Sequence, residues 1–431
     1  MRNRRVHPIL AVSVFLLLLG SSLRSLGCAM TSDTGSDLNP TSTTAALSTV
    51  PTKSSLDSVQ PRSSSTTAST STNPVAGIPD PLQAIVGVDD TLLWRVTSKG
   101  VQTIDIGVNH AAMTGDRGWT VVYSRLDEGE LYVWRPEQSS TQGAVRLKVG
   151  SGGRFDVTHM ALSPDEWHLA VVGYEPTGES PTGKQSKGYL VDLETKQAET
   201  WDSLDAVRSG EEITAFHWDK GSRAIYLSFG PPGGSLGERT YQYDMSARSF
   251  TELQGLATAF DAGLQGQVLG LALETPYEHT EDGAVTGSRP LALWEDGQLT
   301  TLPRDPRLGA WSFGWLSDDG QTIIVFGRTT RGDRTLPCLE VLKLGEAGWK
   351  VDYLFIDDSL VLLSGLAFEP NSSVFWFQAG SSPDQAGLLT SVDLYQFDTK
   401  TGLVQRSLVL PGTPQSTLAV GLGFSACRGG T

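Results

Sequence analysis

Cysteine and positive charge are both scarce in this chain of 431 residues, and each scarcity excludes a class of protein. The three cysteines, Cys28, Cys338 and Cys427, are too few for a fold held together by disulfides. Only 33 Lys and Arg oppose 48 Asp and Glu, so the formal net charge is -15. Because binding to a phosphate backbone requires many basic residues, we expect no nucleic-acid partner. The fold must therefore rest on a hydrophobic core.

Recognisable catalytic motifs are also missing. The sequence contains no G-x-S-x-G elbow, no H-E-x-x-H helix, no P-loop and no Cys–His spacing typical of a metal site. Adjacent carboxylates, such as Asp318 and Asp319, lie in expected turns, where solvated charge is normal. The sequence therefore identifies no catalytic residue and no cofactor, and it leaves the presence of a metal unknown.

The chain has no apolar run long enough to cross a bilayer, because Ile9 to Gly20 is a run of only twelve residues. A basic start, MRNRR, precedes this run and small residues follow it, which is the order of a secretory signal. The sequence SLGC ending at Cys28 resembles a bacterial lipobox, in which cleavage leaves a lipid-modified cysteine. We therefore expect a signal peptide over 1–29 and a protein outside the cytoplasm, anchored to the membrane only through lipid on Cys28. Simple secretion with cleavage near Ala29 is the alternative.

Residues 30–79 have the composition of a tether. From Thr31 to Val75, 23 of 45 residues are Ser or Thr, with prolines interspersed and no apolar period that could form a core. A flexible chain of roughly 50 residues has an r.m.s. span of about 40 Å. We expect a disordered linker that holds a domain clear of a membrane surface.

From residue 80 onward, a pattern of apolar strand, acidic turn and apolar strand returns about every fifty residues. The turns include LSPDEW at Leu162 and LSDDGQ at Leu316, and short strands rich in β-branched and aromatic residues flank them. This pattern predicts an all-β fold, a seven-bladed β-propeller over 80–431. Tryptophans at strand ends, such as Trp94, Trp134 and Trp294, are expected to pack between blades. Six or eight blades stay open, because the fourth copy lacks a clean acidic turn.

The two ends of this domain predict how the ring closes. Residues 84–104 hold three strands without a preceding first strand, and Ser416 to Phe424 form one further strand at the other terminus. Pairing of the terminal strands would complete one blade and leave only short protected edges.

The repeats LSPDEWHLAVVGY, LSDDGQTIIVFG and LYQFDTKTG resemble the WD40-like repeats of TolB-type propellers, and the resemblance covers about residues 80–424. It implies the architecture but no activity. TolB carries an additional α/β domain, whereas this chain has the Ser/Thr-rich tether in that place, so the partners of TolB are not implied. The turn aspartates are expected to bond nearby backbone N–H groups and so to fix the hairpins.

Several connections between the second and third strands of the repeats are long, as after Glu175, Gly230, Glu274 and Gln378, so we expect function on the face that carries them. Two histidines, His110 and His159, each precede a turn aspartate by six residues. In neighbouring blades both imidazoles could approach the mouth of the central channel and bind a metal or an anion, but isolated histidines more commonly form hydrogen bonds to the backbone. The matching residues in other repeats are Ile213, Phe313 and Gly365.

Cys338 begins an expected strand and Cys427 follows the closing strand, so these two form a candidate disulfide once Cys28 carries lipid. Taken together, the sequence favours a monomeric, exported and non-enzymatic module that binds or scaffolds a protein, peptide or glycan. A propeller hydrolase or lyase with its active site at the channel mouth is the alternative.

Overall fold

The computed structural model describes residues 82–424, apart from several connecting segments. The segments outside the description are 90–91, 98–99, 114–119, 126–129, 136–144, 150–154, 177–183, 209–210, 232–236, 274–277, 280–284, 287–288, 306–307, 332–333, 358–359, 382–390 and 411–417. Residues 1–73 form one unit and residues 74–431 another. The predicted signal peptide, Cys28 and the tether lie outside the described residues. Among the described residues, no helix is long and apolar enough to span a bilayer.

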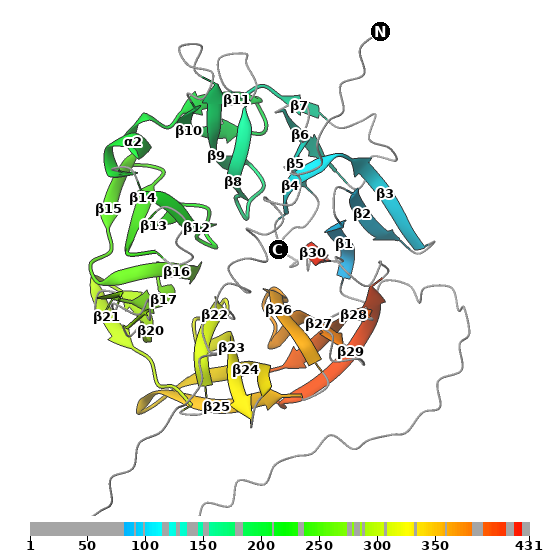
Figure 1. Cartoon of the computed structure of the whole chain (residues 1–431), viewed down its shortest axis with the longest axis vertical. Coiled ribbons are helices and arrows are strands. Elements are labelled where there is room, and N and C mark those ends of the chain that lie inside the picture. Colours follow the sequence, from blue (N-terminus) through cyan, green and yellow to red (C-terminus); the bar gives the residue numbers. More distant parts are fainter. Residues whose placement is uncertain are drawn as a thin grey trace, which may run out of the picture. The chain divides into compact units, whose positions relative to one another are not determined.

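The described chain folds into seven four-stranded antiparallel sheets, the blades of a β-propeller (Figure 1). The strands of each blade are given from inner to outer. Blade 1 consists of β30 (Leu418–Phe424), β1 (Leu82–Asp89), β2 (Leu92–Thr97) and β3 (Gly100–Ile106), and blade 2 of β4 (Val108–Met113), β5 (Val121–Arg125), β6 (Leu131–Trp134) and β7 (Val145–Leu147). Blade 3 consists of β8 (Asp156–Leu162), β9 (His168–Pro176), β10 (Lys184–Asp192) and β11 (Gln197–Thr200). Blades 4 and 5 are β12 (Glu212–Trp218), β13 (Ala224–Gly230), β14 (Arg239–Asp244) and β15 (Ser249–Glu252); β16 (Leu256–Ala262), β17 (Val268–Ala272), β20 (Leu291–Glu295) and β21 (Gln298–Thr301).

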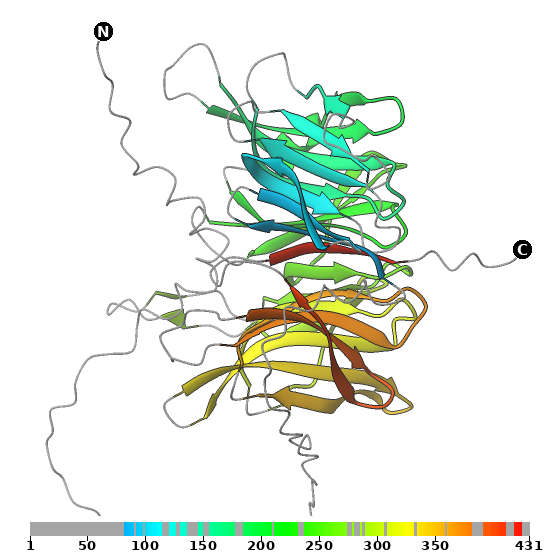
Figure 2. The same cartoon turned by 90° about the vertical axis from the view of Figure 1, so that its right-hand side faces the viewer.

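Blades 6 and 7 are β22 (Leu308–Leu316), β23 (Thr322–Arg331), β24 (Arg334–Gly345) and β25 (Gly348–Ile356); β26 (Leu360–Phe368), β27 (Val374–Ser381), β28 (Ser391–Asp398) and β29 (Leu403–Leu410). Two short elements interrupt the described pattern: helix α2 (Asp202–Arg208) between blades 3 and 4, and a hairpin of β18 (Glu278–His279) and β19 (Val285–Thr286) within blade 5. Figure 2 shows this hairpin projecting from one face of the propeller.

The ring closes as predicted, because β30 at the C-terminal end pairs antiparallel with β1 in blade 1. The inner strands β30, β4, β8, β12, β16, β22 and β26 then contact one another in succession around the ring. Seven blades are therefore confirmed, and the alternatives of six or eight are excluded. The copy without a clean acidic turn is blade 5, a regular blade whose first turn has Gln265 at the position of Asp165, followed by Gly266 with φ 83.

The hydrophobic core lies between neighbouring blades. All seven residues of β13 are buried, whereas the outer strand β11 has three exposed residues out of four. One buried cluster joins Ile324 and Phe326 of blade 6 to Phe375 and Phe377 of blade 7. Each blade therefore has two covered faces in its inner half, which explains the continuous apolar runs of the second strands. Trp94 and Trp134 are buried, at 4% and 1% exposure, as expected for packing between blades.

The acidic turns act as hairpin fasteners, as the sequence predicts. In blade 3, Asp165 Oδ1 accepts hydrogen bonds from the Ser163 hydroxyl at 2.5 Å and from the Trp167 N–H at 3.0 Å. In a later turn, Asp244 Oδ1 accepts the N–H groups of Ser246 and Ala247 at 2.7 and 2.8 Å. The Ser246 hydroxyl and these N–H groups hold the pKa of Asp244 below its usual value, because they stabilise the ionised carboxylate.

Candidate functional site

The antiparallel meander divides the connections between two ends of the blades. Turns from first to second strand and from third to fourth strand, such as 163–167 and 193–196, lie at one end, which we call the turn face. The connections between second and third strands lie at the other end, the loop face. Most of the long connections expected to carry function, including 177–183 and 382–390, fall outside the described residues. A functional role for the loop face therefore stays a prediction.

His110 and His159 do occupy corresponding places on neighbouring inner strands. Each follows a register shift in its ladder, and they pair with Ser124 and Val172. Burial lowers the pKa of His110, while a hydrogen bond to the backbone of Val157 on β8 acts in the opposite direction. His159 Nδ1 lies 3.2 Å from the Thr158 hydroxyl. The His110 bond thus joins blade 2 to blade 3, and ligand binding by either histidine stays a prediction.

The structure corrects one sequence match and adds one histidine. In blade 4 the counterpart of His159 is Ala215 and not Ile213, since Ala215 pairs with Ser228 directly after the register shift. In blade 3 the Ser163 hydroxyl accepts the His168 N–H, and in blade 4 Asp219 accepts the Ala224 N–H at 2.8 Å. Asp219 is therefore equivalent to Ser163 and not to Asp165, so counting six residues back from Asp219 reaches the wrong residue.

His217, which sequence reasoning missed, lies on β12 with Nε2 3.0 Å from the Ala259 carbonyl. Burial lowers the pKa of His217, while the Ala259 bond and Asp261 act in the opposite direction.

At the turn face, a lysine bridges the ends of several inner strands. The Lys220 ammonium donates to the Leu316 carbonyl and lies 2.9 Å from Asp318 Oδ1. It also lies 5.7 Å from the centre of the Phe368 ring, and Asp318 Oδ2 accepts the Asn371 N–H at 3.2 Å. The side chains of Lys220 and Asp318 are only 17% and 25% exposed. The expectation of a solvated Asp318 is therefore wrong: it links blade 6 to blades 4 and 7.

An ion pair with well-aligned hydrogen bonds joins blades 1 and 2 toward the loop face. The Arg125 guanidinium bonds both oxygens of Asp105, with Nη2 2.7 Å from each, and the Tyr123 hydroxyl donates to Asp105 at 2.7 Å. Arg125 also lies 4.9 Å from the centre of the Tyr132 ring. Burial and the bond to Asp105 raise the pKa of Tyr123. The buried acceptor is thus fully engaged by its neighbours, an arrangement typical of a structural contact.

A cavity lies on the turn face between blades 2 and 3, with a volume of about 420 Å³. Its buried part consists of Val133, Leu147 and Leu193. Its rim consists of Arg135, Glu166, Trp167, Glu194 and Lys196. The groove therefore combines an apolar floor with a rim that carries four charged side chains and one indole. We call it the Trp167 groove.

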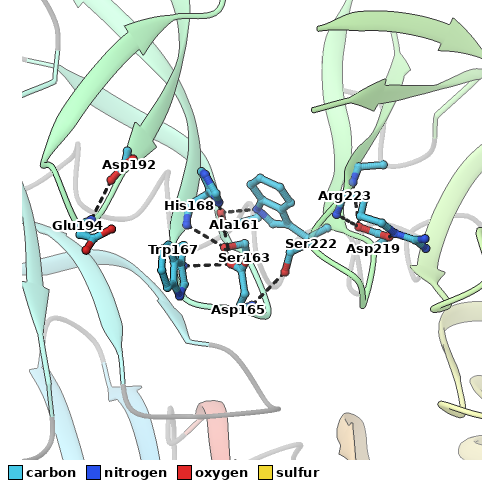
Figure 3. A network of polar contacts seen from close by, with 12 residues as sticks. Ala161, Ser163, Asp165, Trp167, His168, Asp192, Glu194, Asp219, Ser222 and Arg223 are labelled. Carbon is cyan, nitrogen blue, oxygen red and sulfur yellow. Dashed lines mark hydrogen bonds and ion pairs between the residues drawn. The ribbon is translucent and has the colours of Figure 1, made fainter. Parts of the chain in front are cut away.

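Hydrogen bonds hold the backbone of Trp167 from two sides while its side chain is 54% exposed. Its N–H donates to Asp165 at 3.0 Å, and its carbonyl accepts the Leu193 N–H at 2.9 Å. Figure 3 shows Trp167 between the turn of Ser163 and Asp165 and the turn that carries Glu194. The sequence does not mark Trp167 as functional, because this residue lies inside the repeated turn that defines the blades.

The remaining predicted sites do not gather at this groove. Cys338 is buried on β24, and burial together with Glu340 raises the pKa of its thiol to about 12. Cys427 lies outside the described residues, so its pairing with Cys338 stays a prediction. Within the described segments, His, Cys, Asp and Glu form no group of three that could hold a metal ion.

Comparison with known proteins places the chain by fold. No family model matches the sequence, and no curated protein matches it. Prolyl oligopeptidase B from Galerina marginata has a TM-score of 0.53 and 9% identity, over 76% of this chain and 48% of that one. The acylaminoacyl peptidase of Pyrococcus horikoshii has a TM-score of 0.47 and 10% identity, over 78% and 52%. The β-propeller domain of the Trilobed protease from Pyrococcus furiosus has a TM-score of 0.43 and 14% identity, over 70% and 84%.

These identities establish likeness of fold alone, and this chain spans about half the length of the first two enzymes. The chain is a seven-bladed β-propeller. Its activity cannot be taken from these proteins, because one fold supports many functions and the function depends on the site.

Proposed function

We propose that this protein is an exported, lipid-anchored propeller of the TolB type that binds a component of the cell envelope or its surroundings without transforming it. The observation that carries the proposal is the Trp167 groove, in which a half-exposed indole stands on a hydrogen-bonded backbone. A large aromatic side chain whose backbone is already ordered binds with little further loss of conformational entropy.

The chemistry of the inner strands supports binding more than catalysis. A hydrolase or lyase needs a positioned acid, base or nucleophile within reach of the substrate. His110 and His217 instead bond backbone groups of the next blade, and burial holds both pKa values low. Asp318, one of the carboxylates at the turn-face end of the inner strands, is bound to Lys220. These groups serve contacts between blades.

Retention of envelope material tests the binding function. The purified full chain is immobilised and incubated with solubilised envelope from its own cell, beside the variants Trp167→Ala and Leu403→Ala. Leu403 is a matched control, because it is 61% exposed on the turn face of another blade. We expect the wild type and Leu403→Ala to retain the same component and Trp167→Ala to lose it. Retention of nothing, or chemical conversion of the retained component, would refute a binding function and favour the hydrolase or lyase.

Anchoring is tested separately, by metabolic labelling with a palmitate analogue. We expect label on the wild-type chain and none on Cys28→Ser, because lipid addition requires the cysteine thiol. Equal labelling of the two chains, or none on either, would refute lipid attachment at Cys28, and the absence of label on both would favour simple secretion.

A further inference from the structure

We propose that the Trp167 groove binds the uncharged sugar rings of a glycan; this inference rests on the proposed function and names the ligand class of the same site. Three properties of the groove carry it: its charge, its aromatic platform and the oriented carboxylate at its edge.

The rim of the groove is electrically balanced, although the protein is not. Arg135 and Lys196 supply two positive charges, and Glu166 and Glu194 supply two negative ones. The whole chain has a formal net charge of -15. An anionic polymer would find no net positive charge at the groove and would be repelled by the negative charge of the whole protein. A cationic polymer would be attracted to the acidic surface in general and not to this groove in particular. The charges therefore favour an uncharged ligand.

Trp167 offers such a ligand an apolar plane. Its side chain is 54% exposed, whereas the other tryptophans whose burial is described are buried or half-buried. An aromatic ring contributes a large contact area at a small entropic cost. Val133 and Leu193, both buried, line the same groove. The apolar face of a sugar ring, which consists of C–H groups, matches this surface.

Glu166 adopts a left-handed backbone conformation at the edge of the groove. Its φ is 65, and the equivalent turn residues are Ser222 in blade 4, with φ 58, and Gly266 and Gly320 in blades 5 and 6, with φ 83 and 67. This conformation is therefore a common feature of these turns. The Thr120 hydroxyl of blade 2 donates to Glu166 Oε2 at 2.7 Å, which orients the carboxylate. Glu166 thus places an oriented acceptor next to Trp167, at a position where blades 5 and 6 have glycine.

The polar groups of the rim also favour a sugar over a proline-rich peptide. Proline has no backbone N–H, so a proline-rich segment offers mainly carbonyl acceptors, which match Arg135 and Lys196 but not the two carboxylates. Sugar hydroxyls both donate and accept, so Glu166 and Glu194 can accept from them while the basic residues donate to them. A ring with an apolar face and hydroxyls at its edge satisfies both kinds of group.

The test measures binding of the purified full chain by calorimetry. The probes are soluble neutral glycans (β-1,3-glucan, xylan, mannan and maltoheptaose), with polyphosphate and a proline-rich decapeptide as comparison ligands. The variants are Trp167→Ala, Glu166→Gly and the control Leu403→Ala. Glu166→Gly is informative because glycine suits the turn, so the fold should be kept while the carboxylate is removed.

We expect at least one neutral glycan to bind the wild type and Leu403→Ala equally. Trp167→Ala should weaken this binding by about tenfold or more, because it removes the aromatic contact. Glu166→Gly should weaken it about fivefold, the effect of losing one hydrogen bond, while its melting temperature stays within about 2 °C of the wild type. A merely structural Glu166 would change the melting temperature and leave the affinity unaltered.

The inference is overturned if no neutral glycan binds, if polyphosphate or the peptide binds more tightly than every glycan, or if Trp167→Ala and Glu166→Gly bind like the wild type. Its failure is distinguishable from that of the proposed function. If envelope material is still retained in a Trp167-dependent manner and proves to be protein, the binding function holds and only the ligand class is wrong.

Discussion

The lysine that bridges the turn-face ends of the inner strands offers a quantitative test of how the ring is held together. Replacing Lys220 by methionine keeps the length of the side chain and removes its ammonium group. The change breaks the 2.9 Å pair with Asp318 and the hydrogen bond to the Leu316 carbonyl. It leaves Asp318 in a site where its side chain is 25% exposed.

The size of the effect follows from this partial burial. Exposed ion pairs contribute about 0.2–1 kcal/mol, whereas breaking a fully buried pair costs about 3–5 kcal/mol. With exposures of 17% and 25%, the Lys220–Asp318 pair lies between these limits. We expect Lys220→Met to lower the free energy of unfolding by about 2 kcal/mol. In a double-mutant cycle with Asp318→Asn, the coupling energy should be about 1–1.5 kcal/mol.

The assay is urea unfolding followed by tryptophan fluorescence for the wild type, the two single variants and the double variant. Lys350→Met, which removes an exposed lysine on β25, is the control and should change the free energy of unfolding by no more than about 0.5 kcal/mol. The coupling should largely persist in 0.5 M NaCl, because salt screens buried pairs less than exposed ones. A coupling below about 0.3 kcal/mol, or one abolished by salt, would refute the idea that this pair joins blades 4 and 6.

Two further predictions concern packing and protonation. Gly365→Ala should destabilise the fold by about 1–3 kcal/mol, because a Cβ would lie 2.5 Å from Trp315 Cη2, whereas Gly345→Ala, with its nearest neighbour at 3.8 Å, should be nearly neutral in the same urea assay. Burial lowers the pKa of His217 below the value of the unfolded chain, so its contribution is complete above about pH 6.5 and declines as pH falls through the folded pKa, by at most about 1.4 kcal/mol per pH unit. His217→Gln should flatten the dependence of unfolding free energy on pH between pH 7 and 5; an unchanged slope would contradict a buried neutral imidazole.

Much of the architecture could be predicted because its signals are local. Ser163 and Asp165, like Ser317 and Asp319, close their own hairpins through hydrogen bonds within five residues. Such turns mark each repeat wherever it lies, and the unpaired strands at the two ends of the domain predicted β30 beside β1. The match of Ile213 to His159 was wrong because a local turn signal does not show which capping residues are equivalent. A turn can be capped by Ser163 in one blade and Asp219 in another, and only the hydrogen bonds show that the two are equivalent.

The functional residues required the tertiary structure. The Trp167 groove combines Val133 and Leu147 of blade 2 with Glu166 and Leu193 of blade 3, and nothing in their spacing marks them as neighbours. The oriented state of Glu166 depends on Thr120, which lies 46 residues away.

The sequence by itself determined the repeat and the way the ring closes, since strands and capped turns follow from neighbouring residues, and it favoured seven blades, which the structure confirmed. Only the tertiary structure decided which turns face one another, and therefore where an indole, two carboxylates and two cations meet. Lys220 and Asp318, 98 residues apart, show the same rule in the fold itself. Contacts between blades arise from the closed ring, so the chemistry they create has no local pattern from which it could be predicted.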